Sequence, residues 1–154
     1  MRLAVHAPLS GTLAALGKVP DPVFAAQMVG SGMAVEPPGD AGPIDVAAPV
    51  TGQVATVRPH AFVIRTGGGA AVLVHLGIDT VRLNGDGFRT HVTEGEQVEV
   101  GQNVITFDPG VVRARGLSAI CPVVVLDSAP GSAQAPSVTG PVRAGALMFS
   151  WAAS

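Results

Sequence analysis

A short pattern that occurs twice constrains the fold of this chain more than any other feature. Residues 7–16 begin with the letters A-P-L-S-G-T, and residues 48–57 begin with A-P-V-T-G-Q. In each copy a proline opens a turn, a glycine follows where the chain bends, and alternating residues then predict a strand. Two such units indicate a β fold whose halves are related by pseudo-symmetry.

The composition agrees with many short strands joined by tight turns. Hydrophobic residues make up 47% of the 154 residues, charged residues only 13%, and there are 20 glycines and 13 prolines. We expect strands at residues 61–65, 71–78, 104–107, 123–126 and 147–149, and short helical turns at 23–28 and 111–117. The sequence therefore predicts a single all-β domain over residues 1–154, an antiparallel β-sandwich or distorted barrel with a flexible loop at 129–137.

Charge, cysteine content and hydropathy argue against several classes of protein. A net charge of −2 gives no electrostatic footprint for nucleic acid. A single cysteine excludes an internal disulfide and agrees with a reducing compartment. No apolar run approaches the ~20 residues needed to cross a bilayer, and Pro8 interrupts the N-terminus before a signal-peptide core develops. We therefore expect a soluble cytoplasmic domain without a membrane-inserted segment.

His75 lies inside an apolar run, residues 71–78, where an imidazole is unfavourable unless it finds a partner. A strand over these residues would place His75 and Gly77 on one face, with Gly77 leaving a notch for a second ring or a partner's side chain. His60 lies one short segment upstream, and we expect it to face His75. Asp79, about 13 Å along the strand, would lie at the rim of the site rather than orient the imidazole.

The chemistry of a neutral imidazole suits reversible phosphoryl transfer, because it is a good nucleophile at neutral pH and leaves readily from phosphorus. Transfer then depends on positioning and on donors aimed at the phosphoryl oxygens, which His60 could supply. An apolar rim that excludes water would favour transfer over hydrolysis. Four residues could form this rim, although composition by itself also allows them to belong to the core: Val23, Phe24, Met28 and Val29.

Residues 69–81 resemble the phosphorylation-site signature of the glucose-type enzyme IIA family of the bacterial phosphoenolpyruvate:sugar phosphotransferase system. Further segments resemble the same family in the same order: residues 19–24, 29–32, 48–52, 60–62, 87–88, 92–95, 100–101 and 122–124. The resemblance covers about residues 3–128. Residues 57–59 depart from it, because they lack the threonine that precedes the accessory histidine in many members, so a backbone carbonyl would have to orient the His60 ring.

The resemblance implies a monomeric β-sandwich that requires no cofactor. It would accept a phosphoryl group from the phosphocarrier HPr and pass it to a cysteine on the EIIB domain of an EIIBC sugar permease. By position, His75 matches the phosphorylated histidine and His60 the histidine that stabilises the phosphoryl group. In some members these two histidines bind Zn²⁺ with a partner's ligand, and regulated enzymes or permeases are further possible partners. The partner-binding face of the family matches Asp21, Val23, Phe24, Met28, Val29, Leu73, Asp79 and Val81.

Other classes of protein share parts of this pattern. A biotinyl or lipoyl carrier needs a lysine at a hairpin tip, and the one lysine, Lys18, is not flanked by paired strands. A zinc endopeptidase of the lysostaphin type needs a His-x-His pair, which the chain lacks. A non-catalytic regulatory module that keeps the docking face would retain the same histidines, so the sequence leaves this alternative open.

Overall fold

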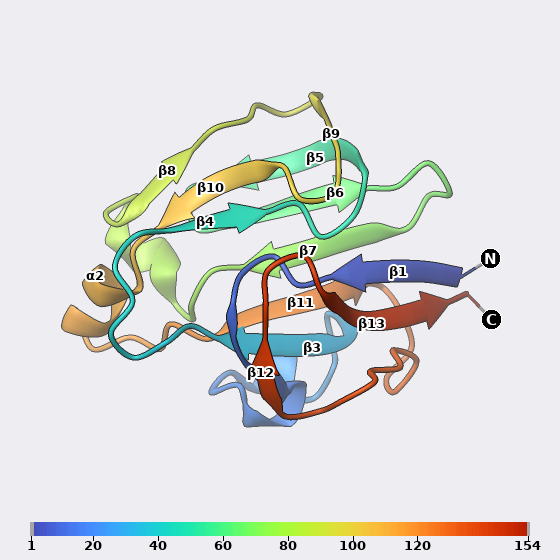
Figure 1. Ribbon diagram of the computed structural model, residues 1–154, viewed down its shortest axis with the longest axis horizontal. Coiled ribbons are helices and arrows are strands. Elements are labelled where there is room, and N and C mark those ends of the chain that lie inside the picture. The colour runs from blue at the N-terminus through green and yellow to red at the C-terminus, as the bar shows by residue number, and fades with distance from the viewer. Residues whose placement is uncertain (1, 154) are drawn as a thin grey trace.

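The computed structural model describes residues 2–153, and short antiparallel strands make up most of it (Figure 1). The helical segments are η1 (Leu16–Lys18), α1 (Pro22–Ala25), η2 (Thr80–Leu83) and α2 (Pro109–Ala114). Within the described residues, no helix is long and apolar enough to cross a membrane. The strands are β1 (Arg2–His6), β2 (Gly11–Ala15), β3 (Gly30–Glu36), β4 (Ile44–Ala47), β5 (Gly52–Arg58), β6 (Ala61–Arg65), β7 (Ala71–His75), β8 (Phe88–Thr90), β9 (Gln97–Val98), β10 (Asn103–Phe107), β11 (Cys121–Leu126), β12 (Gly140–Val142) and β13 (Leu147–Ala152).

The strand order shows the predicted pseudo-symmetry. The largest sheet has the order β12-β2-β3-β11-β7-β6-β5-β9, so it can be divided between β11 and β7 into two halves of similar build. At this division Val74 of β7 lies opposite Val123 of β11. The pair β1-β13 in one half corresponds to the pair β4-β10 in the other, and both pairs carry a register shift. The all-β prediction is confirmed.

Reciprocal hydrogen bonds join the two copies of the repeat. The amide of His6 donates to the carbonyl of Pro49 at 2.9 Å, and the amide of Ala47 donates to the carbonyl of Pro8 at 2.8 Å. These four residues are related by the same shift along the chain that relates the two proline-led turns. The proline turns therefore hold the halves against each other, which explains why this short pattern is informative about the fold.

The glycine of each repeat lies at the first position of its strand, where two backbones approach closely. A Cβ atom on Gly11 would lie 2.2 Å from the carbonyl oxygen of Glu36, and one on Gly52 would lie 2.2 Å from that of Arg65. No side chain fits at either distance. Glycine is thus required here by the spacing of neighbouring strands rather than by a special backbone angle.

Two clusters of buried side chains cover opposite faces of the large sheet. Val123 and Val125 belong to the main core, which fills the space toward the smaller sheets. Val124, between them in sequence, belongs to a second cluster on the other face, since successive side chains of a strand alternate. The connection from β2 to β3, which contains η1 and α1, covers part of this second face (Figure 1). The corresponding connection from β5 to β6 is only the turn Pro59–His60.

The boundaries of several elements differ from the prediction. β7 ends at His75 rather than continuing to residue 78, because the backbone of Gly77 has a φ of 79°. The two helices begin before the predicted ranges, since a proline occupies the first turn of each and an aspartate, Asp21 or Asp108, caps it. Residues 129–137 form an irregular loop whose flexibility stays a prediction.

We expect Gly52→Ala to lower the free energy of unfolding by about 1–3 kcal/mol or more, because the added methyl group overlaps the Arg65 carbonyl. Urea unfolding would measure this change. Gly67→Ala is the matched control, since a Cβ there meets nothing within 4 Å. Equal stability of the two variants would contradict the close-approach argument.

Candidate functional site

The ends of two antiparallel strands bring His60 and His75 together. His75 is the last residue of β7 and lies opposite Ala61, the first residue of β6, and His60 lies in the turn just before β6. The amide of Leu76 donates to the carbonyl of His60 at 2.8 Å and extends this pairing by one bond. The two imidazole rings meet edge to face, with centroids 5.2 Å apart and an interplanar angle of 74°.

The carbonyl of Gly77 orients the His75 ring. Nδ1 of His75 lies 2.6 Å from this oxygen, and because a carbonyl can only accept, the ring donates from Nδ1. The lone pair is thereby left on Nε2, which has no hydrogen-bond partner within residues 2–153. This side-chain to backbone bond is a feature that the sequence reasoning missed, since it depends on the bend after β7.

The prediction of a notch beside Gly77 is wrong. Gly77 is buried, and a Cβ there would lie 2.7 Å from Cγ2 of Thr80 and 2.9 Å from the carbonyl oxygen of Ser118. No second ring can enter this space. Gly77 is required because the chain turns through positive φ and because Thr80 and Ser118 pack directly against it.

Both imidazoles favour the neutral form. Burial is the main cause that lowers the pKa of His75, while the bond to Gly77 and the carboxylates of Asp21 and Asp79 act in the opposite direction. Burial also lowers the pKa of His60, followed by the nearby His75 and the guanidinium of Arg58. A neutral His75 at physiological pH is a nucleophile through Nε2.

The ring of His60 is held less firmly than that of His75. Neither ring nitrogen of His60 has a hydrogen-bond partner in the described chain. The backbone carbonyl that we expected to orient this ring, in place of the family's threonine, therefore does not do so. The ring is partly exposed. Arg58, two residues earlier, is paired with Glu94 at 3.1 Å. His60 therefore has a free nitrogen to offer to a ligand beside His75.

Helix α1 places an aromatic ring against His75. The carboxylate of Asp21 accepts from the amides of Val23 and Phe24 at 2.9 and 3.3 Å and so starts the helix. Phe24 is 8% exposed, and its ring centroid lies 5.4 Å from that of His75. The cap thus fixes Phe24 in contact with the imidazole.

Apolar side chains, several of them exposed, occur on α1, on the segment after it, on β7 and on η2, which follows the turn after His75. Val23 is 44% exposed, Met28 is 74% exposed and Val81 is 63% exposed. Val29 and Leu73 are partly buried and pack against the second cluster. A contiguous patch of exposed apolar side chains is typical of a surface that binds another protein. We call these five residues the apolar rim.

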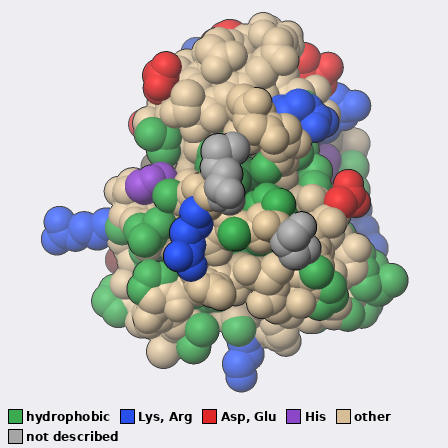
Figure 2. All heavy atoms as spheres, turned by 90° about the vertical axis from the view of Figure 1, so that its right-hand side faces the viewer, with side chains coloured by type: hydrophobic (Ala, Val, Ile, Leu, Met, Phe, Trp, Pro, Cys, Tyr) green, Lys and Arg blue, Asp and Glu red, His purple; other side chains and the backbone are tan. Residues whose placement is uncertain are grey.

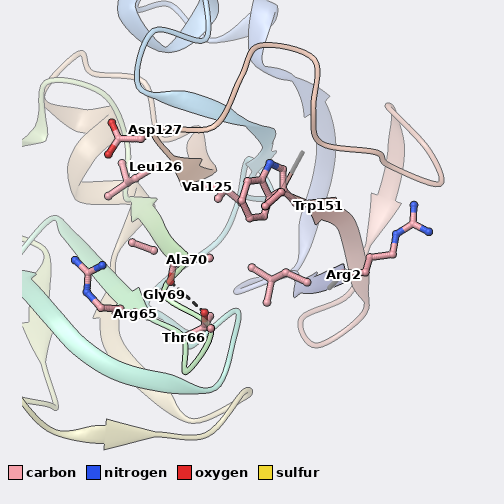
Figure 3. Close-up of a pocket in the computed structure, with 13 residues that line it drawn as sticks. Arg2, Arg65, Thr66, Gly69, Ala70, Val125, Leu126, Asp127 and Trp151 are labelled. Carbon is pink, nitrogen blue, oxygen red and sulfur yellow. Dashed lines mark hydrogen bonds between the residues drawn. The ribbon is translucent and has the colours of Figure 1, made fainter.

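A separate pocket lies at the opposite end of β6 and β7. It has a volume of about 600 Å³ and is bordered by Arg2, Arg65 and Trp151, with Arg2 and Arg65 at opposite sides in Figure 3. Figure 2 shows this face, which carries both termini, with hydrophobic side chains around its middle. Since β7 has five residues, the pocket lies roughly 15 Å from the histidines. Neither histidine lines it.

We expect the free energy of unfolding to rise with pH on the acid side of about 6.5, the ordinary pKa of histidine. The folded chain has lowered histidine pKa values, so the unfolded chain binds more protons in this window. In the double variant His60→Gln/His75→Gln the rise should be shallower, as measured by urea unfolding at several pH values. His91→Gln removes a distant imidazole and is the control. An unchanged slope in the double variant would contradict the burial argument.

Comparison with known proteins supports one family throughout the chain. The sequence profile of the phosphoenolpyruvate-dependent sugar phosphotransferase system, EIIA 1, matches residues 3–130. The chain is 44% identical over 123 residues to the "PTS system glucose-specific EIIA component" of Halalkalibacterium halodurans. These aligned residues make up 79% of this chain and 69% of that protein. It is 43% identical over 123 residues to the "PTS system glucose-specific EIIBCA component" of Corynebacterium glutamicum, covering 79% of this chain and 18% of that longer protein.

A solved structure has the same fold. The glucose permease IIA of Mycoplasma capricolum superposes with a TM-score of 0.84 at 34% identity, covering 97% of this chain and 96% of the other. Together with the paired histidines, these likenesses agree with the sequence resemblance. The chain therefore belongs to the EIIA 1 family, a phosphotransferase component of the phosphoenolpyruvate-dependent sugar phosphotransferase system that acts in sugar uptake.

Proposed function

We propose that His75 carries a phosphoryl group on Nε2, accepting it from phospho-HPr and donating it to the cysteine of an EIIB domain. The observation that supports this best is the bond from Nδ1 of His75 to the carbonyl of Gly77, which leaves the lone pair of the ring on Nε2. During uptake the bond from phosphorus to the donor breaks as the bond to Nε2 forms. During donation the Nε2 bond breaks as a bond to sulfur forms.

The proton on Nδ1 stays in place through both steps. The Gly77 carbonyl only accepts hydrogen bonds, so the bond persists only while Nδ1 carries its proton. The phosphorylated imidazole therefore keeps this proton and carries positive charge. Asp21 and Asp79 favour the same positive charge. A protonated ring is a better leaving group from phosphorus than a neutral ring without that proton. The site is therefore suited to pass the group on as well as to take it up.

His60 is the residue that we propose to stabilise the transferred group. Its ring meets His75 edge to face, and its nitrogens have no other hydrogen-bond partner in the described chain. An N–H of this ring can donate to a phosphoryl oxygen where negative charge accumulates. The ring of Phe24, packed against His75, keeps water from part of the imidazole, which favours transfer over hydrolysis.

The partners are proposed to dock on the apolar rim, with Asp21 and Asp79 at its border. An EIIB domain is supported by relatives whose names join the components in one chain. Besides the EIIBCA protein of Corynebacterium glutamicum, the "PTS system glucosamine-specific EIICBA component" of Bacillus subtilis is 41% identical over 119 residues. HPr is the donor that the family membership suggests. The same proposal includes a monomer in the cytoplasm, where a buried, unpaired Cys121 agrees with reducing conditions.

A Zn²⁺ ion shared with a partner is a secondary part of the proposal. Residues 2–153 contain no group of three or more His, Cys, Asp or Glu side chains suited to a metal. His60 and His75 could supply two ligands, and the Nδ1 bond of His75 to a carbonyl is the arrangement that metal-binding histidines use. A partner would have to complete the tetrahedral set. Phosphoryl transfer as described needs no metal.

Phosphorylation by the purified system tests the proposal. We expect incubation with phosphoenolpyruvate, enzyme I and HPr to add one phosphoryl group to the chain, seen by intact mass measurement. His75→Ala should take up none, and His60→Gln should take up the group but fail to pass it to an EIIB domain. Acid-labile, base-stable label on His75→Ala would contradict the assignment. A wild-type chain that takes up no phosphate would favour the regulatory module.

Charge placed on the apolar rim tests the docking face. We expect Val81→Asp to slow phosphorylation at low HPr by roughly fivefold or more, because docking would bury an unpaired carboxylate at this position. Saturating HPr should restore most of the rate. Val138→Asp is the matched control, since Val138 is 60% exposed but lies in the loop before β12. Equal slowing by both variants would place the docking surface elsewhere.

A further inference from the structure

The turn that follows β7 has an unusual backbone. Gly77 has a φ of 79° and Asp79 a φ of 60°, so two residues of one short turn lie in the left-handed region. For Asp79, which has a Cβ, this conformation is unfavourable by about 1 kcal/mol and must be held by its surroundings. The direction of the Gly77 carbonyl, and with it the Nδ1 bond of His75, depends on this turn.

Thr80 closes the turn with its side chain. It is 1% exposed, and its hydroxyl donates to the carbonyl of Leu76 at 2.8 Å. Its methyl group, Cγ2, packs against Gly77, since a Cβ on Gly77 would lie only 2.7 Å from it. The hydroxyl and the methyl group thus hold both sides of the peptide unit that joins Leu76 to Gly77.

The backbone of Leu76 and Gly77 connects Thr80 to both histidines through three successive peptide units. The amide of Leu76 donates to the carbonyl of His60 at 2.8 Å, while the carbonyl of Gly77 accepts from Nδ1 of His75 at 2.6 Å. A change at Leu76 or Gly77 would therefore alter the relation between the two rings. A second anchor of the turn, the bond from Ile78 N–H to the Ser118 carbonyl at 2.9 Å, is formed by backbone atoms only. Val112 also packs against Gly77, but Thr80 adds a buried hydroxyl that is hydrogen-bonded to the backbone of the turn.

We propose that Thr80 is a positioning residue for phosphoryl transfer, which holds the Gly77 carbonyl against Nδ1 of His75 and so keeps the lone pair of His75 on Nε2. The role in transfer rests on the proposed function, whereas the effect on the imidazole does not. Thr80 neither donates to the phosphoryl group nor contacts Nε2. It acts through Leu76 and Gly77.

The test compares Thr80→Val, which keeps the shape but loses the hydroxyl, with Thr80→Ser, which keeps the hydroxyl. The first readout is the tautomer of His75, measured by ¹H–¹⁵N NMR of the ring nitrogens without any phosphoryl donor. We expect a single tautomer with the proton on Nδ1 in the wild type and in Thr80→Ser, and a mixture in Thr80→Val. The second readout is the rate of phosphorylation by phospho-HPr, which should fall on the order of tenfold or more in Thr80→Val and recover in Thr80→Ser.

Thr66→Val is the matched control. Thr66 donates from its hydroxyl to the carbonyl of Ala70 at 3.2 Å, at the other end of β7, so this variant also loses one threonine to carbonyl bond. It should leave the His75 tautomer and the transfer rate unchanged. If Thr80→Val does not fold, Thr80→Ala takes its place.

Two results would overturn the proposal: a wild-type tautomer in Thr80→Val, or a tautomer change that Thr66→Val produces equally. Failure of the proposed function looks different. In that case the wild-type chain takes up no phosphate, while the tautomer still responds to Thr80→Val.

Discussion

The pairing of β7 with β11 is the constraint on which the rest of the structure depends, because the two halves of the eight-stranded sheet meet there. Val72, Leu73 and Val74 form this ladder, and His75 follows immediately after it. His75 thus lies at the point where a central strand, bonded on both sides, leaves the sheet. Its backbone is held by the sheet and its ring is held by the turn that follows.

The sequence was most informative where a residue type is required by a local geometry. The two proline-glycine units predicted the pseudo-symmetric β fold, because a turn and a close backbone approach each demand one residue type. The pattern around His75 predicted its strand and, through the family resemblance, its partner His60. Features formed by contacts distant in sequence could not be predicted in this way. The contact of Gly77 with Ser118 is one example.

The error at Gly77 shows the same limit. Alternation of side chains assumes that a strand continues, and nothing in the letters of residues 71–78 indicates where β11 stops supporting β7. The sequence predicts that Gly77 leaves a space beside His75, whereas in the structure Gly77 supplies the carbonyl that accepts from Nδ1 of His75. Every residue carries the same backbone carbonyl, so the sequence does not indicate which carbonyl will contact a side chain. A site formed partly by backbone groups can therefore be predicted only in part.

The two halves of the sheet differ in one connection, which is long between β2 and β3 and only a turn between β5 and β6. By the pairing of Val74 with Val123, the positions equivalent to His75 and His60 are Val124 and Ser31, and both of these are buried. In one half the outer face supports the long β2–β3 connection, whereas in the other half it carries His60 and His75. Side chains of that connection can therefore be exchanged without disturbing the β7–β11 ladder that leads to His75.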